Sequence, residues 1–102
     1  MGTVFSKNGV SIRLTDERWL HITEEHSELA GYYFEVLETL QEPEAIYEGK
    51  MEELLAVKEI EPEKYMVVVY KEDITHNDGF VITAFLTRRI KQVRRRNKLW
   101  PQ

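Results

Sequence analysis

The sequence of 102 residues contains no cysteine, which excludes disulfide bonds, a thiolate nucleophile and any zinc site with cysteine ligands. No apolar run approaches the roughly 20 residues needed to span a bilayer, and the first ten residues lack the apolar core of a secretory signal. No internal repeat, low-complexity segment or linker interrupts the chain. These absences predict a cytoplasmic protein without membrane contact, folded as a single domain over residues 1–102.

The composition is typical of a globular protein, with 42% hydrophobic and 31% charged residues, but the charge is unevenly spread. Residues 1–87 contain all 18 acidic side chains and seven basic ones, so their net charge is −11. Residues 88–98 contain the other seven basic side chains and no acid, so their net charge is +7. Such a segment either contacts phosphate groups or neutralises acidic surface on its own chain or on a partner, and both interpretations fit.

Local patterns in the first half predict a β-hairpin and two helices. Asn8-Gly9 lies between two β-prone runs and suits a two-residue type I′ turn, so residues 4–14 are expected to form the hairpin. Thr15 can cap a helix that runs to about residue 26. A second helix is expected over residues 27–41, because its apolar residues recur with helical spacing. Those apolar residues are Leu29, Tyr32, Tyr33, Val36, Leu37 and Leu40.

The second half predicts an antiparallel sheet. Strands are expected at residues 45–47, 54–60, 65–71 and 80–87, and their short connections favour antiparallel neighbours. A short basic helix is expected over residues 93–100. The predicted fold is therefore α+β: two N-terminal helices packed on a four-stranded antiparallel sheet, preceded by a short β-hairpin and followed by a basic C-terminal tail.

The last predicted strand has two different faces. The face expected to pack on the helices is apolar and consists of Phe80, Ile82, Ala84 and Leu86. The opposite face consists of Val81, Thr83, Phe85, Thr87 and Arg89. Hydroxyl and guanidinium donors suit phosphate, and an unpaired base can stack on an aromatic ring. An ordinary solvent-exposed face fits the same residues, because Thr and Phe are good strand formers.

The two histidines of the first predicted helix, His21 and His26, are candidates for proton transfer near neutral pH. Their spacing of five residues does not place them on one helix face, so no metal site is predicted there. His21 and Glu25 are also expected to form an ordinary surface pair, and His26 suits the C-terminal end of a helix. Lys58 and Lys71 carry fixed charges that suit either a developing phosphorane or a cross-strand ion pair.

Four short segments, within about residues 12–100, together resemble one known family. His21–Leu29 is similar to its "His-Ile…His-Pro-Glu" opening, and Pro43-Glu44 to the Pro-Asp that follows its second helix. Residues 65–71 and 79–88 are similar to its two core strands, with the tetrad Ile82–Phe85 as the most distinctive part. The family is the superfamily of compact ribonucleases that includes barnase, EndoU, colicins and RelE, in its phage- and toxin-type members.

The resemblance implies a metal-independent ribonuclease with no cofactor and with the two-helix, four-strand fold described above. In such an enzyme a base takes the RNA 2′-hydroxyl proton, the oxygen attacks the adjacent phosphorus, and an acid protonates the leaving 5′ oxygen. The implied catalytic residues are His21 or His26, Lys71, Thr83 and Arg88. The expected RNA-binding residues are Lys58, Phe85, Thr87, Arg89, Arg94, Arg95 and Arg96.

A toxin-type ribonuclease also implies an antitoxin-like partner protein. The alternative function is a catalytically inactive module of the same fold that binds protein or RNA. In that case the acidic body and the basic tail provide protein contacts, including contacts between copies of the chain.

Overall fold

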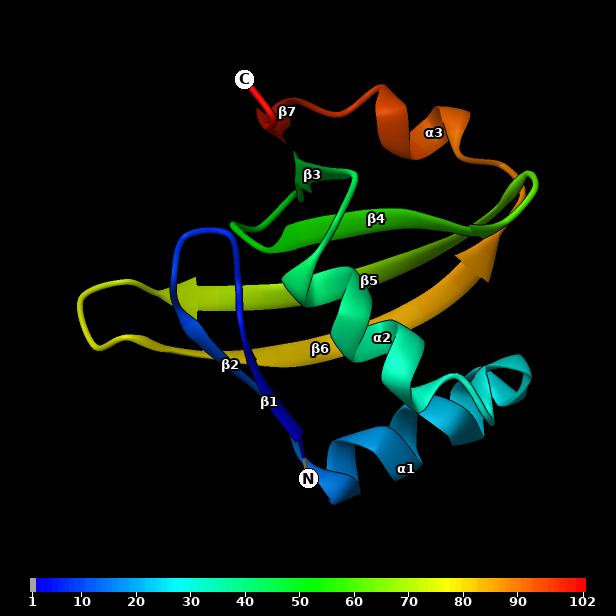
Figure 1. Ribbon diagram of the computed structural model, residues 1–102, viewed down its shortest axis with the longest axis horizontal. Helices are drawn as coiled ribbons and strands as arrows, with labels where there is room; N and C mark the ends of the chain where they lie inside the picture. The colour runs from blue at the N-terminus through cyan, green and yellow to red at the C-terminus, as the bar shows by residue number, and fades with distance from the viewer. Residues whose placement is uncertain (1) are drawn as a thin grey trace.

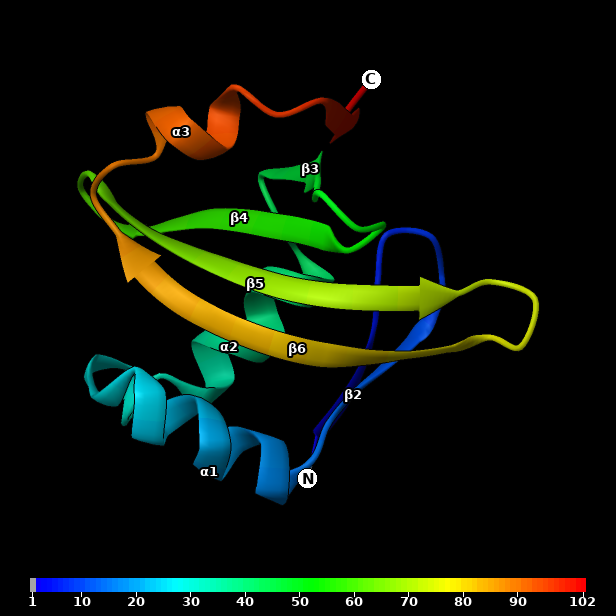
Figure 2. The same ribbon diagram turned by 180° about the vertical axis from the view of Figure 1, so that it is seen from behind.

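The computed structural model describes residues 2–102, and its helices and one curved sheet are shown from two sides in Figures 1 and 2. The strands are β1 (Gly2–Phe5), β2 (Ser11–Leu14), β3 (Ala45–Glu48), β4 (Leu54–Glu61), β5 (Lys64–Asp73), β6 (Asp78–Thr87) and β7 (Lys98–Trp100). The helices are α1 (Asp16–Glu25), the 3-10 turn η1 (Ser27–Leu29), α2 (Tyr33–Gln41) and α3 (Lys91–Arg94). No helix in residues 2–102 has the length and apolar character needed to cross a membrane.

The predicted sheet of four antiparallel strands is wrong, because the sheet formed by residues 2–102 is mixed and has seven strands in the order β1-β2-β6-β5-β4-β3-β7. The four predicted strands form its centre and do pair antiparallel. The hairpin extends the same sheet, because β2 pairs in parallel with the start of β6. Gly79 permits this approach, since a Cβ atom there would lie 2.5 Å from Ile12 Cδ1.

The predicted C-terminal helix over residues 93–100 is also wrong. Only Lys91–Arg94 is helical, and Lys98–Trp100 forms β7, which pairs antiparallel with β3 and covers its free edge. Ile90 and Val93 are buried on the sheet. The basic C-terminal segment is therefore docked on the sheet at both of its ends and is not a free tail.

Two further local predictions need correction. The chain does not form one helix from residue 27 to residue 41, because η1 ends at Leu29 and Gly31 adopts a φ of +93° before α2 begins at Tyr33. In the hairpin turn Gly9 has a positive φ of 78° and Asn8 does not, so the turn is not type I′. It is a β-turn followed by one left-handed residue. The cap at Thr15 is confirmed, since its Oγ1 accepts a hydrogen bond from the Arg18 N–H at 3.1 Å.

A β-bulge in β6 interrupts the predicted alternation of side chains. Val69 of β5 pairs with Thr83, whereas the next residue, Tyr70, pairs with Val81. Ile82 therefore has no partner in the register of the two strands. An extra residue of this kind shifts every side chain on one side of it to the other face.

The shift changes which residues of β6 face the helices. Val81 is buried in the core although its alternation with Thr83 predicts the open face, and Phe80 is 44% exposed. The prediction that Phe80 and Ile82 pack on the helices is therefore wrong. Beyond the bulge, Ala84 and Leu86 contact the core as predicted.

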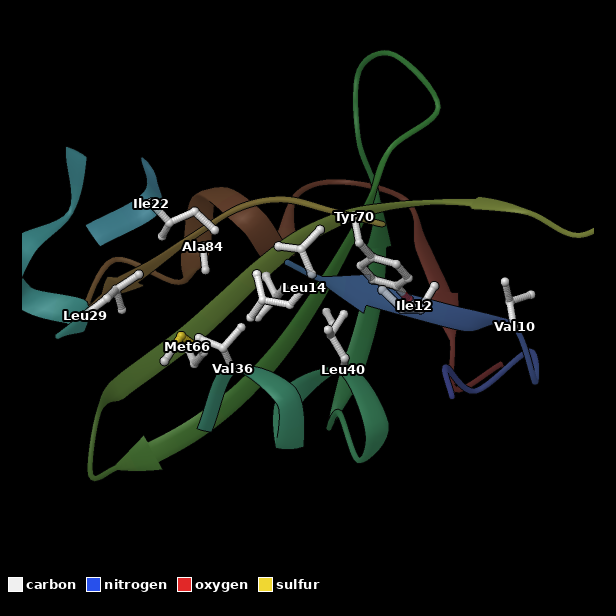
Figure 3. Close-up of a cluster of buried hydrophobic side chains, with 13 residues drawn as sticks. Val10, Ile12, Leu14, Ile22, Leu29, Val36, Leu40, Met66, Tyr70 and Ala84 are labelled. Carbon is white, nitrogen blue, oxygen red and sulfur yellow. The ribbon is translucent and has the colours of Figure 1, made fainter. Parts of the chain in front are cut away.

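The main core lies between the helices and one face of the sheet (Figure 3). Its buried side chains include Ile12, Leu14, Ile22, Leu29, Val36, Leu40, Met66, Val68, Tyr70 and Ala84. A smaller cluster on the other face joins α3 to the sheet and consists of Tyr47, Val57, Val67, Ile90 and Val93. Central strand β5 is thus buried on both faces over most of its length, as its continuous apolar run predicts.

The outer edge of β6 is paired with β2 only at Gly79 and Phe80. Beyond these residues, α1 and η1 lie beside β6 (Figure 2). Arg18 of α1 reaches this edge, and its Nη1 lies 3.4 Å from the Ile82 carbonyl oxygen that it faces. This arrangement brings the C-terminal end of α1 next to the end of β6.

Candidate functional site

An open groove of about 550 Å³ lies where β5 begins and β6 ends. Five of its lining side chains are cationic: Arg88, Arg89, Lys91, Arg94 and Arg95. Glu63 is the one carboxylate among the lining residues, which also include Tyr65, Ile90 and Gln92. We call this site the basic groove. An excess of four positive charges in one concavity is an electrostatic setting that attracts polyanions.

The basic groove follows from the amphipathic character of a single helical turn. Ile90 and Val93 are three residues apart, so both face the sheet and bury their side chains in the smaller cluster. The intervening and following cations, Lys91, Arg94 and Arg95, are consequently exposed. Hydrophobic anchoring thus holds several like charges close together on the surface.

Tyr65 supplies an aromatic ring to the groove. The guanidinium carbon of Arg94 lies 5.2 Å from the ring centroid, and Arg94 Nη2 lies 3.4 Å from the Tyr65 hydroxyl oxygen. Arg88 Nη1 lies 3.4 Å from the Pro62 carbonyl oxygen. The Thr87 hydroxyl oxygen accepts a hydrogen bond from the Arg89 N–H at 2.9 Å, which leaves its own proton available to a ligand.

His26, at the C-terminal end of α1, does not line the groove but contacts Phe85 of β6. Its ring centroid is 6.4 Å from that of Phe85, and its side chain is one-third exposed. Phe85 and Thr87 share one face of β6 and are about 7 Å apart, from a rise of about 3.3–3.4 Å per residue. Thr87 pairs directly with Tyr65 across the strands. His26, Phe85, Thr87 and Tyr65 therefore follow one another toward the groove.

His21 lies in a different place from His26. Its Nε2 is 2.7 Å from Glu25 Oε1, and both side chains are more than half exposed. His21 lines a separate hollow over α1, of about 580 Å³, together with Thr15, Glu17, Arg18, Leu20 and Glu24. This hollow is similar in size to the basic groove, but its charges are mixed and the basic C-terminal segment contributes none of its lining.

The two lysines singled out from the sequence do not line the groove. Lys71 pairs with Phe80 near the far end of β5, six residues and about 20 Å from Tyr65 at the rise of an extended strand. Lys58 Nζ lies 3.1 Å from the Glu42 carbonyl oxygen and 3.8 Å from Glu38 Oε1, so it contacts α2 on the opposite face.

Thr83 and Arg96 lie outside the groove as well. Thr83 lies on the same face as Phe85 but two residues farther from the groove. Arg96 Nε donates to the Glu48 carbonyl oxygen at 2.6 Å and so ties the C-terminal segment to β3. The structure thus places His26, Phe85 and Thr87 in a row that leads to the groove, whose cations are Arg88, Arg89, Lys91, Arg94 and Arg95.

Tyr65 and Lys91 line the groove but are not among the residues that the sequence pattern indicates. Tyr65 could have been found from the sequence, because aligning the two predicted strands as antiparallel neighbours places it opposite Thr87. Lys91 could be assigned to the groove only from the position of α3, which the sequence pattern does not give. In residues 2–102 no group of three His, Asp or Glu side chains is close enough together to hold a metal ion.

Comparison with known proteins identifies no relative: no family model, no curated protein and no solved structure matches the chain.

Proposed function

We propose that this chain binds single-stranded RNA in the basic groove and cleaves it without a metal ion, with His26 as the proton-transfer group. The observation that supports the proposal is the continuous arrangement of a histidine, two aromatic rings, a threonine hydroxyl and five cations. Guanidinium groups suit phosphate, and splayed bases of single-stranded RNA stack on aromatic side chains. In a double helix the bases are stacked on one another and cannot stack on a protein side chain, so the proposed ligand is single-stranded RNA.

In the proposed reaction His26 takes the proton of the ribose 2′-hydroxyl, and the resulting oxygen attacks the adjacent phosphorus. The bond from phosphorus to the 5′ oxygen of the next nucleotide breaks, which leaves a 2′,3′-cyclic phosphate. Water, which enters the open groove, protonates the departing 5′ oxygen. Arg88 and Arg94 stabilise the additional negative charge on the phosphorane oxygens by their fixed positive charges.

The test is a cleavage assay on a single-stranded RNA in EDTA, with DNA of the same sequence as a control that has no 2′-hydroxyl. We expect cleavage of the RNA alone and products that end in 2′,3′-cyclic phosphate. His26→Ala should lower the rate about 10²- to 10⁴-fold, as loss of general acid–base catalysis does. His21→Ala is the matched control and should leave the rate unchanged, because His21 lies outside the groove. A strict requirement for added metal, or equal rates for wild type and His26→Ala, would contradict the proposal.

The second candidate function is RNA binding without cleavage. It is favoured by the fact that no histidine of residues 2–102 lines the groove and that His26 is the single histidine in contact with Phe85, so the second proton transfer has no histidine to perform it. Wild-type protein that binds RNA in a salt-dependent manner and releases no product over long incubation would support this alternative.

A cytoplasmic location and an antitoxin-like protein partner belong to the same proposal, whereas self-association between the acidic body and the basic groove belongs to the non-catalytic alternative. Growth arrest on expression of the wild-type chain, and its absence with His26→Ala, would support the toxin-type interpretation.

A further inference from the structure

We infer that the RNA-binding surface extends beyond the basic groove to a second base-stacking position at Phe80 and Lys71, so that the preferred substrate is a single strand of several nucleotides. This inference rests on the proposed function. It concerns the same sheet face, and it identifies the length of RNA that the chain engages.

The first observation is the position of Phe80, which the bulge at Ile82 moves to the open face of the sheet. Phe80 lies inside a ten-residue strand, yet it is 44% exposed. Without the bulge, its alternation with Ala84 would place this ring in the core. Bulges commonly redirect a side chain next to a functional site. An aromatic ring presented in this way is a stacking platform for an unpaired base.

The second observation is the cation beside that ring. Lys71 pairs with Phe80 across β5 and β6, and its side chain is exposed. Within residues 2–102 no carboxylate oxygen lies within 4.0 Å of Lys71 Nζ. Arg13 of β2 also pairs with Phe80, but it is engaged by Asp78 at 3.0 Å and 3.1 Å. Lys71 is consequently the cation available to a phosphate at this position.

Three acidic groups near Lys71 and Phe80 accept hydrogen bonds from the protein. Asp78 is bound by Arg13, and Asp73 accepts hydrogen bonds from His76, which lower its pKa. Glu53 accepts a hydrogen bond from the Met51 N–H at 2.7 Å, and this bond is the main reason that its pKa is lowered. Lys71 and Arg96 add smaller electrostatic contributions to the same carboxylate. These carboxylates keep their negative charge, and Asp78 is the one paired with an arginine, so Lys71 supplies the attraction for a phosphate at this position.

The third observation is that no helix in residues 2–102 covers the sheet face between the basic groove and Phe80. Val69, Thr83 and Phe85 are half-buried on this face, and α2 covers the opposite one (Figure 2). Phe80 and Phe85 are about 15 Å apart at the rise of an extended strand. A single strand of RNA that places a phosphate in the basic groove can therefore continue past Phe85 and the Thr83 hydroxyl to reach Phe80.

The test compares the binding of two 2′-O-methyl oligouridylates, which cannot be cleaved by 2′-hydroxyl attack. One has about two nucleotides and the other about eight, within the range of roughly 4–16 nucleotides typical of single-strand sites. We expect wild-type protein to bind the longer probe more tightly. Phe80→Ala should weaken binding of the longer probe by about 5- to 150-fold, the effect of losing one base–aromatic stack, and leave the shorter probe unaffected.

Three variants make the result specific. Phe80→Tyr keeps the ring and should retain wild-type affinity. Phe34→Ala removes an exposed ring on α2, on the other side of the sheet, and should change nothing. Lys71→Gln should lower the slope of log affinity against log salt by about 0.7 for the longer probe alone. A thermal melt of each variant verifies folding, which is expected because the altered side chains are exposed.

The outcomes separate this inference from the proposed function. Equal affinity of the two probes, or an equal effect of Phe80→Ala and Phe34→Ala on the longer probe, would overturn the base-stacking position at Phe80. Either result would leave the proposal that RNA binds in the basic groove unaffected. Failure of Arg94→Gln to weaken either probe would instead overturn the groove as the RNA site. If neither probe binds wild-type protein, both proposals fail.

Discussion

The guanidinium of Arg94 lies over the ring of Tyr65, with its central carbon 5.2 Å from the ring centroid. These residues are far apart in the sequence, and they meet because Val93 anchors α3 on the sheet beside the start of β5. The ring restricts the position of the cation without neutralising it, so the full charge remains available to a phosphate. This pair organises the centre of the basic groove.

The ring of Tyr65, more than its hydroxyl, is expected to hold Arg94 in place. The separation of 3.4 Å between Arg94 Nη2 and the hydroxyl oxygen is long for a hydrogen bond. Tyr65→Phe should therefore bind RNA like wild type, whereas Tyr65→Leu should bind about 2- to 5-fold more weakly, the effect of losing an exposed cation–π contact. A filter-binding titration would measure both variants. Equal weakening by Phe and Leu would show that the hydroxyl is the important group.

The packing of α2 on the sheet predicts that two leucine-to-alanine substitutions in this helix lower the stability by different amounts. Leu40 is fully buried, and Leu37 packs against the same core but is partly exposed. Leu40→Ala should lower the free energy of unfolding by about 2–5 kcal/mol, and Leu37→Ala by less, because part of its surface remains in water. Urea denaturation of both variants would test the order. A larger loss for Leu37→Ala would mean that α2 is rotated about its axis.

Local patterns in the sequence were sufficient for the central strands, the start of α1 and the apolar stripe of α2. They succeeded because each depends on neighbouring residues: Thr15 caps the N–H three residues later, and the Met66–Tyr70 run is apolar because β5 is covered on both faces. The second helix was extended too far because Leu29 fits the helical spacing of α2 although it belongs to η1.

Three features required information that the local sequence does not carry. The parallel pairing of β2 with β6 joins residues more than sixty positions apart, and β7 forms because β3 offers it an edge. The bulge at Ile82 is set by the register between β5 and β6, and it reversed the faces assigned to Phe80 and Val81. The choice between His21 and His26 likewise depends on where α1 ends relative to β6.

The break between η1 and α2 predicts the effect of substituting Gly31. Its φ of +93° is a conformation that residues with a Cβ atom rarely adopt, although a Cβ atom there would contact nothing within 4 Å. Gly31→Ala should therefore lower the free energy of unfolding by about 1–2 kcal/mol through backbone strain alone. Gly49→Ala is not a suitable control because its Cβ would collide with Glu53. Ala30→Ser, at an exposed neighbouring position, should change the stability little in the same denaturation experiment.

The hydroxyl of Tyr70 is buried and has no hydrogen-bonding partner among residues 2–102. Tyr70→Phe removes this uncompensated group, so the free energy of unfolding at neutral pH should be unchanged or higher by up to about 1–3 kcal/mol. A decrease measured by urea denaturation would show that the hydroxyl has a stabilising partner.

The same residue predicts a pH dependence of stability. Burial raises the pKa of Tyr70 above its ordinary value. Below about pH 10 the phenol is neutral in both states, whereas above it only the unfolded chain ionises, so stability falls as the pH rises. Tyr70→Phe should remove up to about 1.36 kcal/mol per pH unit of that fall. Parallel slopes for wild type and variant between about pH 10 and about pH 11 would contradict the assignment of this effect to Tyr70.

The three consecutive arginines predict the sharpest contrast, because the structure assigns them different contacts. Arg94 and Arg95 line the basic groove, whereas Arg96 donates to the Glu48 carbonyl oxygen and lies outside the lining. Each phosphate contact with a single strand contributes about 0.7 to the slope of log affinity against log salt. Replacing Arg94 and Arg95 together with Gln should therefore lower the slope by about 1.4 and leave the thermal melt nearly unchanged, since exposed charges contribute little stability. Arg96→Gln should do the reverse: the salt slope stays the same, while the lost hydrogen bond to β3 lowers stability by about 0.5–1.5 kcal/mol. If instead the segment serves to neutralise the acidic body, the double variant will keep its salt slope and change its self-association, which sedimentation of the same samples would reveal.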